Sequence, residues 1–268
     1  MSVEKPKTIQ MFVEKMNEKA ASISMSRSMF KNPTGLTEKY QLSTSYDLSL
    51  LTLHASANVD IVRIWKKKHY SFWVKGPNAR RMDLTTRVDN EKLNQYYDIL
   101  GGKTGTVGFI KNLCLLIYDG ETVYIVTLLK ARGNRFHQAK LLIDYLLNKG
   151  SLDGVDTTAY TVLKYPSCNP YLFTRFKPEI LISKNGNARN NPASLTKLLT
   201  LLTALDYPLD LNKNLTVKAE DMAEDNLNDI REGDIISLDD ALHLILLRSS
   251  ILWLTCLVDM SQNIIFNV

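Results

Sequence analysis

The sequence is poor in the residues that staple small proteins or hold metal ions. Its 268 residues include 3 cysteines, with no CxxC pair, and 4 histidines, with no HExxH or HxH spacing. An odd cysteine count without paired spacing excludes a disulfide framework and a zinc ribbon. Cys114, inside the apolar run 113–117, is expected to be a small core residue. We therefore expect neither a metal site nor a cofactor.

Long hydrophobic runs are also scarce. Residues 1–10 contain no apolar core of the kind that a secretory signal needs. Residues 251–268 are more apolar, but Asp259 and the polar stretch 261–263 interrupt them. The uninterrupted part falls short of the roughly 20 apolar residues that cross a bilayer. We expect a buried helix there and no membrane anchor.

The composition is that of an ordinary globular protein, with 45% hydrophobic and 23% charged residues. A chain of this length buries a sizeable core. Charge is unevenly divided, because residues 1–150 hold 23 basic and 13 acidic side chains and residues 151–268 hold 10 and 15. The basic residues are scattered, and only 64–69 forms a cluster. We therefore expect no nucleic-acid partner.

Periodicity and turn residues predict mixed helices and strands. Residues 1–57 are expected to be mostly helical, with a turn at 32–36 and a helix start at 43–47. Asp119-Gly120, between two apolar runs, predicts a hairpin. The remaining predictions are strands at 69–74, 112–118, 122–129, 160–163 and 179–183, helices at 137–147 and from 191 to 205, a linker at about 148–159, and mainly helix after 205.

One pair of residues has the spacing for nucleophilic catalysis. Ser194 and Lys197 are three residues apart, so a helix places them on one face, about one turn apart. A lysine can take the serine proton there if burial and nearby positive charge favour its neutral form. The same spacing occurs at Ser2 and Ser28, but only Ser194 follows Asn-Pro-Ala and precedes an apolar helix.

A second motif is Lys103-Thr104-Gly105, which occurs once, ahead of an apolar strand. A lysine, a hydroxyl and a residue without a side chain could line a cleft that accepts a carboxylate. The alternative is a solvated turn in which glycine serves only the backbone conformation.

Together these motifs resemble the serine D-Ala-D-Ala carboxypeptidases, the low-molecular-weight penicillin-binding proteins of the peptidase S11 family, which use SxxK, SxN and KTG motifs. The resemblance covers most of the chain, at 32–36, 43–48, 102–106, 192–197 and 246–250. It implies the α+β fold of the serine β-lactamases and transpeptidases: an antiparallel sheet flanked by helices, with a helical subdomain beside it.

The resemblance also implies roles for the motif residues. Ser194 would attack the substrate carbonyl with Lys197 as general base, and Ser249 and Lys103 would pass a proton to the leaving group. Thr104, Gly105 and Thr106 would bind the substrate, a peptidoglycan stem peptide ending in D-Ala-D-Ala, and β-lactams would acylate the same serine. The site would lie outside the cytoplasm, in the periplasm or on the cell-wall side.

The motif order departs from the family, in which SxxK and SxN precede KTG. Here Lys103 comes first, so the sequence resembles a circularly permuted member whose former ends are joined through about 148–159. Under this interpretation residues 1–268 form one catalytic domain, with 61–198 mainly the sheet subdomain and 1–60 with 199–268 mainly the helical subdomain. A permuted fragment that needs a second copy would form a swapped dimer; otherwise we expect a monomer.

The SxN motif departs too, because Ile251 stands where the family has asparagine. Ser261-Gln262-Asn263 is a weaker candidate for this motif. Two alternatives to an active carboxypeptidase therefore remain: a catalytically impaired module that binds muropeptides, and a β-lactamase-related hydrolase. Residues 224–228 match the ExxLN string of class A β-lactamases, but they precede Ser249, and we interpret the match as coincidence.

Overall fold

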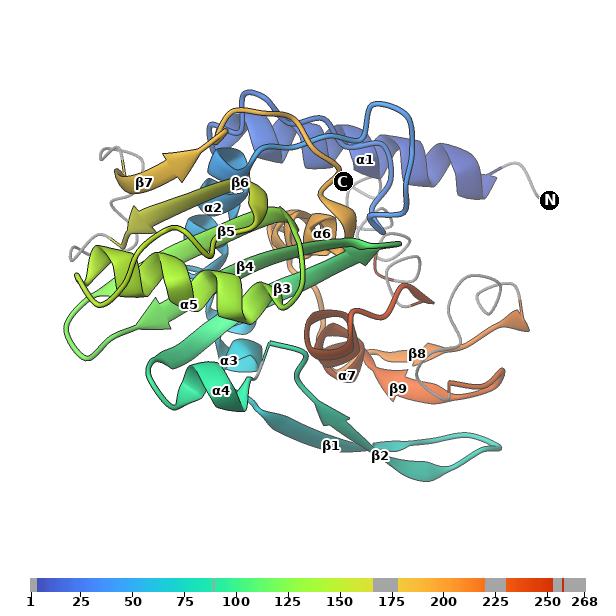
Figure 1. Cartoon of the computed structure of the whole chain (residues 1–268). Coiled ribbons are helices and arrows are strands. Elements are labelled where there is room, and N and C mark those ends of the chain that lie inside the picture. Colours follow the sequence, from blue (N-terminus) through green and yellow to red (C-terminus); the bar gives the residue numbers. More distant parts are fainter. Residues whose placement is uncertain (1–3, 89, 166–177, 220–229, 253–256, 258–268) are drawn as a thin grey trace.

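The computed structural model describes residues 4–88, 90–165, 178–219, 230–252 and 257. It is an α+β structure built on a five-stranded antiparallel sheet of order β3-β4-β5-β6-β7 (Figure 1). The predicted α+β class with an antiparallel sheet flanked by helices is confirmed. The strands of this sheet are β3 (Asp98–Val107), β4 (Ile110–Tyr118), β5 (Val123–Ala131), β6 (Thr157–Lys164) and β7 (Glu179–Lys184).

The β4–β5 hairpin forms where Asp119-Gly120 predicted it. The Asp119 carboxylate accepts hydrogen bonds from the backbone N–H groups of Glu121 and Thr122, at 2.9 and 2.7 Å. Gly120 has φ +105°, a conformation that glycine adopts without steric cost. Both strands are buried along most of their length, because helices cover both faces of the sheet.

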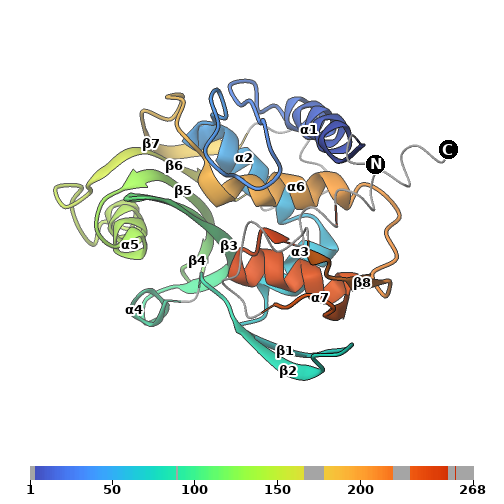
Figure 2. The ribbon, with the colours of Figure 1, turned by 90° about the vertical axis from the view of Figure 1, so that its right-hand side faces the viewer.

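Helices form a layer on each face of the sheet (Figure 2). One face carries α2, which packs on β4, β5 and β6 and against α6, and α6 in turn packs on α1. The predicted start of α2 is confirmed, because the Thr44 side chain caps it by accepting from Asp47 N at 3.0 Å. The other face carries α5 and α4. These helices are α1 (Glu4–Ser22), α2 (Ser45–Ala55), α4 (Glu91–Asn94), α5 (Arg135–Leu146) and α6 (Thr196–Ala204).

A second group of elements lies beside the free edge of β3. It contains two short antiparallel hairpins, β1–β2 and β8–β9, and the helices α3, α7 and η4. A capping box between Ser237 and Asp240 starts α7. The bounds are α3 (Val59–Trp65), β1 (His69–Val74), β2 (Arg80–Thr85), β8 (Asn214–Thr216), β9 (Ile235–Ser237), α7 (Leu238–His243) and the π-helix η4 (Leu244–Arg248).

The stretch after residue 205 differs from the helical structure that we expected. It includes β8 and β9, each of three residues, which pair with each other. Strands this short contain too few residues to show an alternating pattern. The predicted linker, about 148–159, follows α5, which ends at Leu146, but its last three residues belong to β6, which begins at Thr157.

Within the described residues, no helix is long and apolar enough to cross a membrane. The helix expected at 251–268 lies mostly outside the described residues. The division into sheet and helical subdomains stays a prediction.

Candidate active site

Ser194 and Lys197 are brought together as their spacing predicts. Ser194 lies in the short helix η2 (Ala193–Leu195), and Lys197 lies in the first turn of α6. The Lys197 Nζ is 2.9 Å from Ser194 Oγ, within hydrogen-bond distance. Lys197 is only 1% exposed, and its amine also donates to the carbonyl of Thr34 at 2.7 Å. The lysine is therefore fixed in a position from which it can exchange a proton with the serine.

The turn at 32–36 packs against the backbone of Ala193 and Ser194. The Asn32 side-chain oxygen accepts from Gly35 N at 2.9 Å and holds the turn closed. A Cβ added to Gly35 would lie 2.2 Å from the Ala193 carbonyl oxygen and 3.0 Å from Ser194 N. Only glycine lets the two backbones approach this closely. Ala193 itself has φ +51°, a strained conformation next to the candidate nucleophile.

Lys103 and Ser249 form a second lysine–serine pair. Lys103 is 1% exposed, and its Nζ donates to Ser249 Oγ at 2.7 Å and to the Thr104 carbonyl at 3.0 Å. Ser249 ends the π-helix η4 in the left-handed conformation, with φ +67°. This conformation turns the chain at the point where the hydroxyl meets Lys103.

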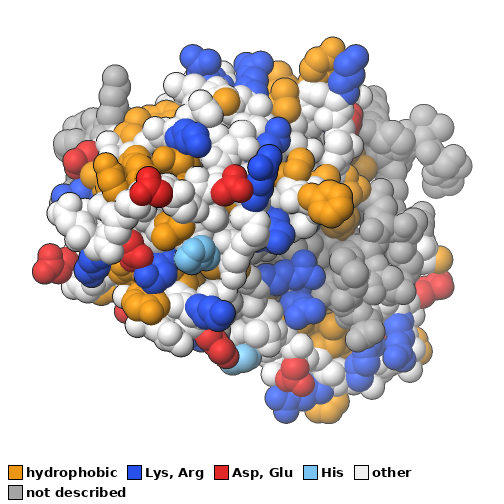
Figure 3. Space-filling model, viewed as in Figure 1, with side chains coloured by type: hydrophobic (Ala, Val, Ile, Leu, Met, Phe, Trp, Pro, Cys, Tyr) orange, Lys and Arg blue, Asp and Glu red, His pale blue; other side chains and the backbone are white. Residues whose placement is uncertain are grey.

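Positive charge gathers around the two pairs. Burial lowers the pKa of Lys103 well below its usual value, and the charges of Lys197, Arg87 and Arg135 lower it further. Figure 3 shows Lys and Arg side chains gathered on the surface between the end of β3 and α7. Such a field favours a neutral amine as proton acceptor and attracts an anionic substrate group.

The strand that contains Thr104, Gly105 and Thr106 runs alongside the serine. β3 is an edge strand that pairs with β4, and η2 packs against both strands. A Cβ added to Gly105 would lie 3.3 Å from Ser194 N, so the backbones of strand and nucleophile are in contact. Thr104 is mostly buried and Thr106 is exposed.

Arg135 is a residue of this site that sequence reasoning missed. Its guanidinium donates to the carbonyl oxygens of Gly105 and Asn112, at 2.7 and 2.8 Å, and to Thr106 Oγ1 at 2.8 Å. It lies in the first turn of α5, about 30 residues along the chain from the strand that it holds. No local motif marks it, because only the packing of α5 on the sheet brings it to β3.

The residues that depart from the expected SxN motif, or could replace it, lie either next to Ser249 or outside the described part of the chain. Ile251 is half-buried, two residues after Ser249. Asn263 and residues 224–228 lie outside the described part of the chain. Within the described part, no group of three His, Cys, Asp or Glu side chains could hold a metal ion.

Comparisons with known proteins point to one family. Residues 7–118 match the family model Peptidase_S11, D-alanyl-D-alanine carboxypeptidase. The D-alanyl-D-alanine carboxypeptidase DacF of Bacillus subtilis is 29% identical over 124 residues, which are 46% of this chain and 28% of the relative. The chain therefore aligns with little more than a quarter of that relative's length. No solved structure matches. Residues 7–118 are therefore similar to the D-alanyl-D-alanine carboxypeptidases of the peptidase S11 family.

Proposed function

We propose that the protein is a serine-type D-Ala-D-Ala carboxypeptidase that acts on peptidoglycan stem peptides through an acyl-enzyme on Ser194 and that also binds penicillins. The observation that carries the proposal is that two lysine–serine pairs, each with a buried lysine, lie beside the strand β3. Lys197 lies 2.9 Å from Ser194, and Lys103 lies 2.7 Å from Ser249. The family match supports the choice of substrate.

Acylation follows from this arrangement. Lys197 takes the Ser194 hydroxyl proton as Oγ bonds to the carbonyl carbon of the penultimate D-Ala. The C–N bond to the terminal D-Ala then breaks, and the proton that Lys197 took reaches the leaving nitrogen through Ser249 and Lys103. Water attacks the ester in the second half of the reaction, which releases the shortened peptide and restores the Ser194 hydroxyl.

The strand edge beside Ser194 would hold the substrate. Thr104 and Thr106 would present their hydroxyls, on either side of Gly105, to a peptide that lies along this edge strand. Arg135, bonded to Thr106 Oγ1, adds a positive charge for the terminal carboxylate. The backbone N–H groups of Ser194 and Thr106 would stabilise the oxyanion.

Ile251 supports a second candidate function. Without the family's asparagine, position 251 offers no amide that would hold the substrate and Lys197. The second candidate function is therefore a catalytically impaired module that only binds muropeptides. A β-lactamase-related hydrolase is the third possibility, and rapid turnover of β-lactams would separate it from the other two.

Covalent labelling with a fluorescent penicillin tests these candidates. We expect a stable adduct in the wild type, none in Ser194→Ala, and release of D-Ala from diacetyl-Lys-D-Ala-D-Ala. Ser28→Ala is the matched control, because Ser28 and Lys31 have the same spacing outside the site. A wild-type chain that binds stem peptide without any adduct would establish the binding module, and rapid loss of the adduct with hydrolysed penicillin would establish the β-lactamase.

We further propose that the motif order reflects a circular permutation. The family model matches the part of the chain that contains Lys103 and stops before Ser194. The proposed joint, about 148–159, follows α5 and runs into the start of β6. Insertion of a protease site after Gly150 tests it: the two cleaved fragments should stay associated and still label with penicillin. Separation of the fragments on cleavage would refute the permutation.

The proposed substrate, peptidoglycan, places the enzyme outside the cytoplasm, and we propose a monomer. Both lysine–serine pairs are complete within one chain, so no second copy is needed to assemble them. Size-exclusion chromatography with light scattering should give the mass of one chain. A dimer mass would support the swapped arrangement instead.

A further inference from the structure

A second cavity lies at the far end of β3, away from Ser194. Its volume is about 450 Å³, and its apolar walls come from α3, β3, β4 and β5. The wall residues include Val62, Trp65, Ile99, Leu100, Leu116 and Val123. Ile99 precedes Gly105 by six residues of extended chain, which separates this cavity from the candidate active site by roughly 20 Å. The cavity is therefore not the catalytic cleft.

The local backbone accounts for the cavity. The pairing of β3 with β4 shifts register between Ile99 and Gly101, so Leu100 is an extra, bulged residue. Leu100 remains 41% exposed. A Cβ added to Gly101 would lie 2.6 Å from the Trp65 ring, so the glycine lets the indole lie against the strand. The bulge and the indole together leave an apolar hollow that the side chains do not fill.

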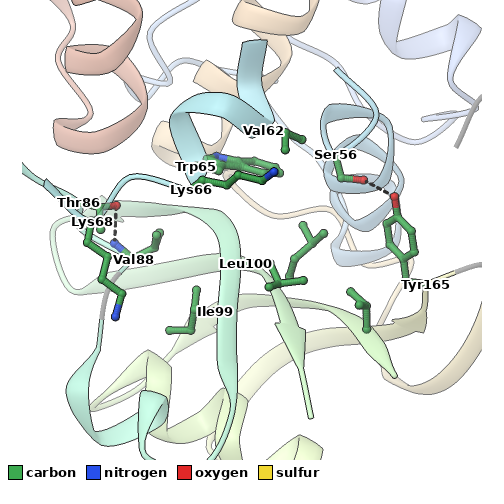
Figure 4. Close-up of a pocket in the computed structure, with 12 residues that line it drawn as sticks. Ser56, Val62, Trp65, Lys66, Lys68, Thr86, Val88, Ile99, Leu100 and Tyr165 are labelled. Atoms are coloured by element: carbon green, nitrogen blue, oxygen red, sulfur yellow. Dashed lines mark hydrogen bonds between the residues drawn. The ribbon is translucent and has the colours of Figure 1, made fainter. Parts of the chain in front are cut away.

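Two lysines, Lys66 and Lys68, line the cavity, and none of the described residues that line it is acidic. Figure 4 shows the Lys66 side chain beside the Trp65 ring. Ser56 Oγ donates to Tyr165 OH at 3.2 Å on the right of that view. The cavity thus combines apolar walls with a cationic and hydroxyl-bearing rim.

We propose that this cavity binds a free single-chain carboxylate of medium length, such as a fatty acid, with its chain along the apolar walls and its carboxylate at Lys66. The volume lies within the range of small-molecule sites, roughly 300–1,000 Å³. Apolar walls with a few polar groups at one end are typical of such sites. The Lys66 amine at the cavity favours an anionic head over a neutral one.

Calorimetric titration with decanoate and with decanol tests this directly. We expect saturable binding of decanoate to the wild type. Lys66→Met should weaken decanoate binding about fivefold, the loss of one partly exposed ion pair, and leave decanol binding unchanged. Leu100→Trp, which fills the hollow, should weaken both ligands at least about tenfold. Lys213→Met is the control, because Lys213 is an exposed lysine outside the cavity.

The folded state of each variant is checked separately. Without ligand, each variant should show a cooperative unfolding transition in a circular dichroism melt. Decanoate should raise the melting temperature of the wild type but not that of Leu100→Trp. The proposal fails if decanoate gives no saturable binding, or if Lys66→Met and Lys213→Met change its affinity equally. Binding to phosphatidylglycerol vesicles without binding of free decanoate would also refute it. None of these readouts depends on acylation of Ser194.

Discussion

Lys103 donates a 2.7 Å hydrogen bond to Ser249 although 146 residues separate them in the chain. The lysine is fully buried, and its pKa is lowered by burial first and then by the positive charges of Lys197, Arg87 and Arg135. It therefore binds a proton less readily in the folded protein than in the unfolded chain. This difference makes folding stability depend on pH.

The direction of that dependence is fixed by the sign of the shift. Between the lowered folded pKa of Lys103 and its usual value of 10.5, the unfolded chain binds more protons, so stability rises with pH. We expect the unfolding free energy of the wild type, relative to that of Lys103→Met, to increase from pH 6.5 to pH 9. Urea titrations at both pH values measure it. An unchanged difference would mean that Lys103 titrates alike in both states.

Gly35→Ala should distort the base of the nucleophile turn. The new Cβ would meet the Ala193 carbonyl oxygen at 2.2 Å, and the residue has φ +84°. We expect a loss of about 1 kcal/mol from the backbone strain and roughly 1–3 kcal/mol more from the clash, with slower penicillin acylation. Gly120→Ala is the matched control, because its φ is +105° and nothing lies within 4 Å. Equal losses of stability in Gly35→Ala and Gly120→Ala would show that the close contact between Gly35 and Ala193 does not contribute.

Local sequence patterns predicted the parts of the fold that depend on neighbouring residues. The hairpin at Asp119-Gly120, the cap at Thr44 and the approach of Lys197 to Ser194 each arise within a few residues. These features follow from turn chemistry and from helical spacing. They could be predicted because no distant part of the chain is needed to form them.

Long-range features could not be derived in this way. Arg135 reaches Gly105 across 30 residues, and Thr34 accepts from Lys197 across 163. Their side chains are ordinary in local context, and only the packing of α5 and of the turn at 32–36 gives them a role. The pairing of Lys103 with Ser249 was expected from resemblance to a family, since nothing in the spacing of these two residues implies it.

His243 should make the protein less stable in acid. It is fully buried, its Nδ1 lies 2.7 Å from the Asp239 carbonyl oxygen, and its Nε2 lies 3.0 Å from Lys67 Nζ. Burial lowers its pKa below 6.5, so the unfolded chain binds more protons as pH falls through 6.5 and stability is lost. His243→Gln should show a smaller fall in melting temperature from pH 7.5 to 5 than wild type. His69→Gln, at an exposed histidine, should behave as wild type; a reduced fall there as well would contradict the assignment.

Arg135→Met should slow the acylation of Ser194, because it removes hydrogen bonds that hold the neighbouring strand β3 in place. The variant removes donors from the carbonyls of Gly105 and Asn112 and from Thr106 Oγ1. We expect the second-order rate of penicillin acylation to fall at least about tenfold. Arg135→Lys keeps the charge but not the fork of donors, so it should recover only part of the rate. Arg132→Met, a largely exposed arginine nearby, should acylate at the wild-type rate; a comparable fall there would attribute the effect to net charge alone.

Ile251→Asn should speed acylation, because it supplies the amide that the site lacks two residues after Ser249. One added hydrogen bond to the substrate or to Lys197 corresponds to about a tenfold gain in rate. Ile251→Ala is the control, since it removes the same apolar side chain without adding an amide. Stopped-flow labelling with fluorescent penicillin gives the rates. If asparagine and alanine change the rate alike, the amide has no role at this position, and the slow step of the wild type must be sought elsewhere in the site.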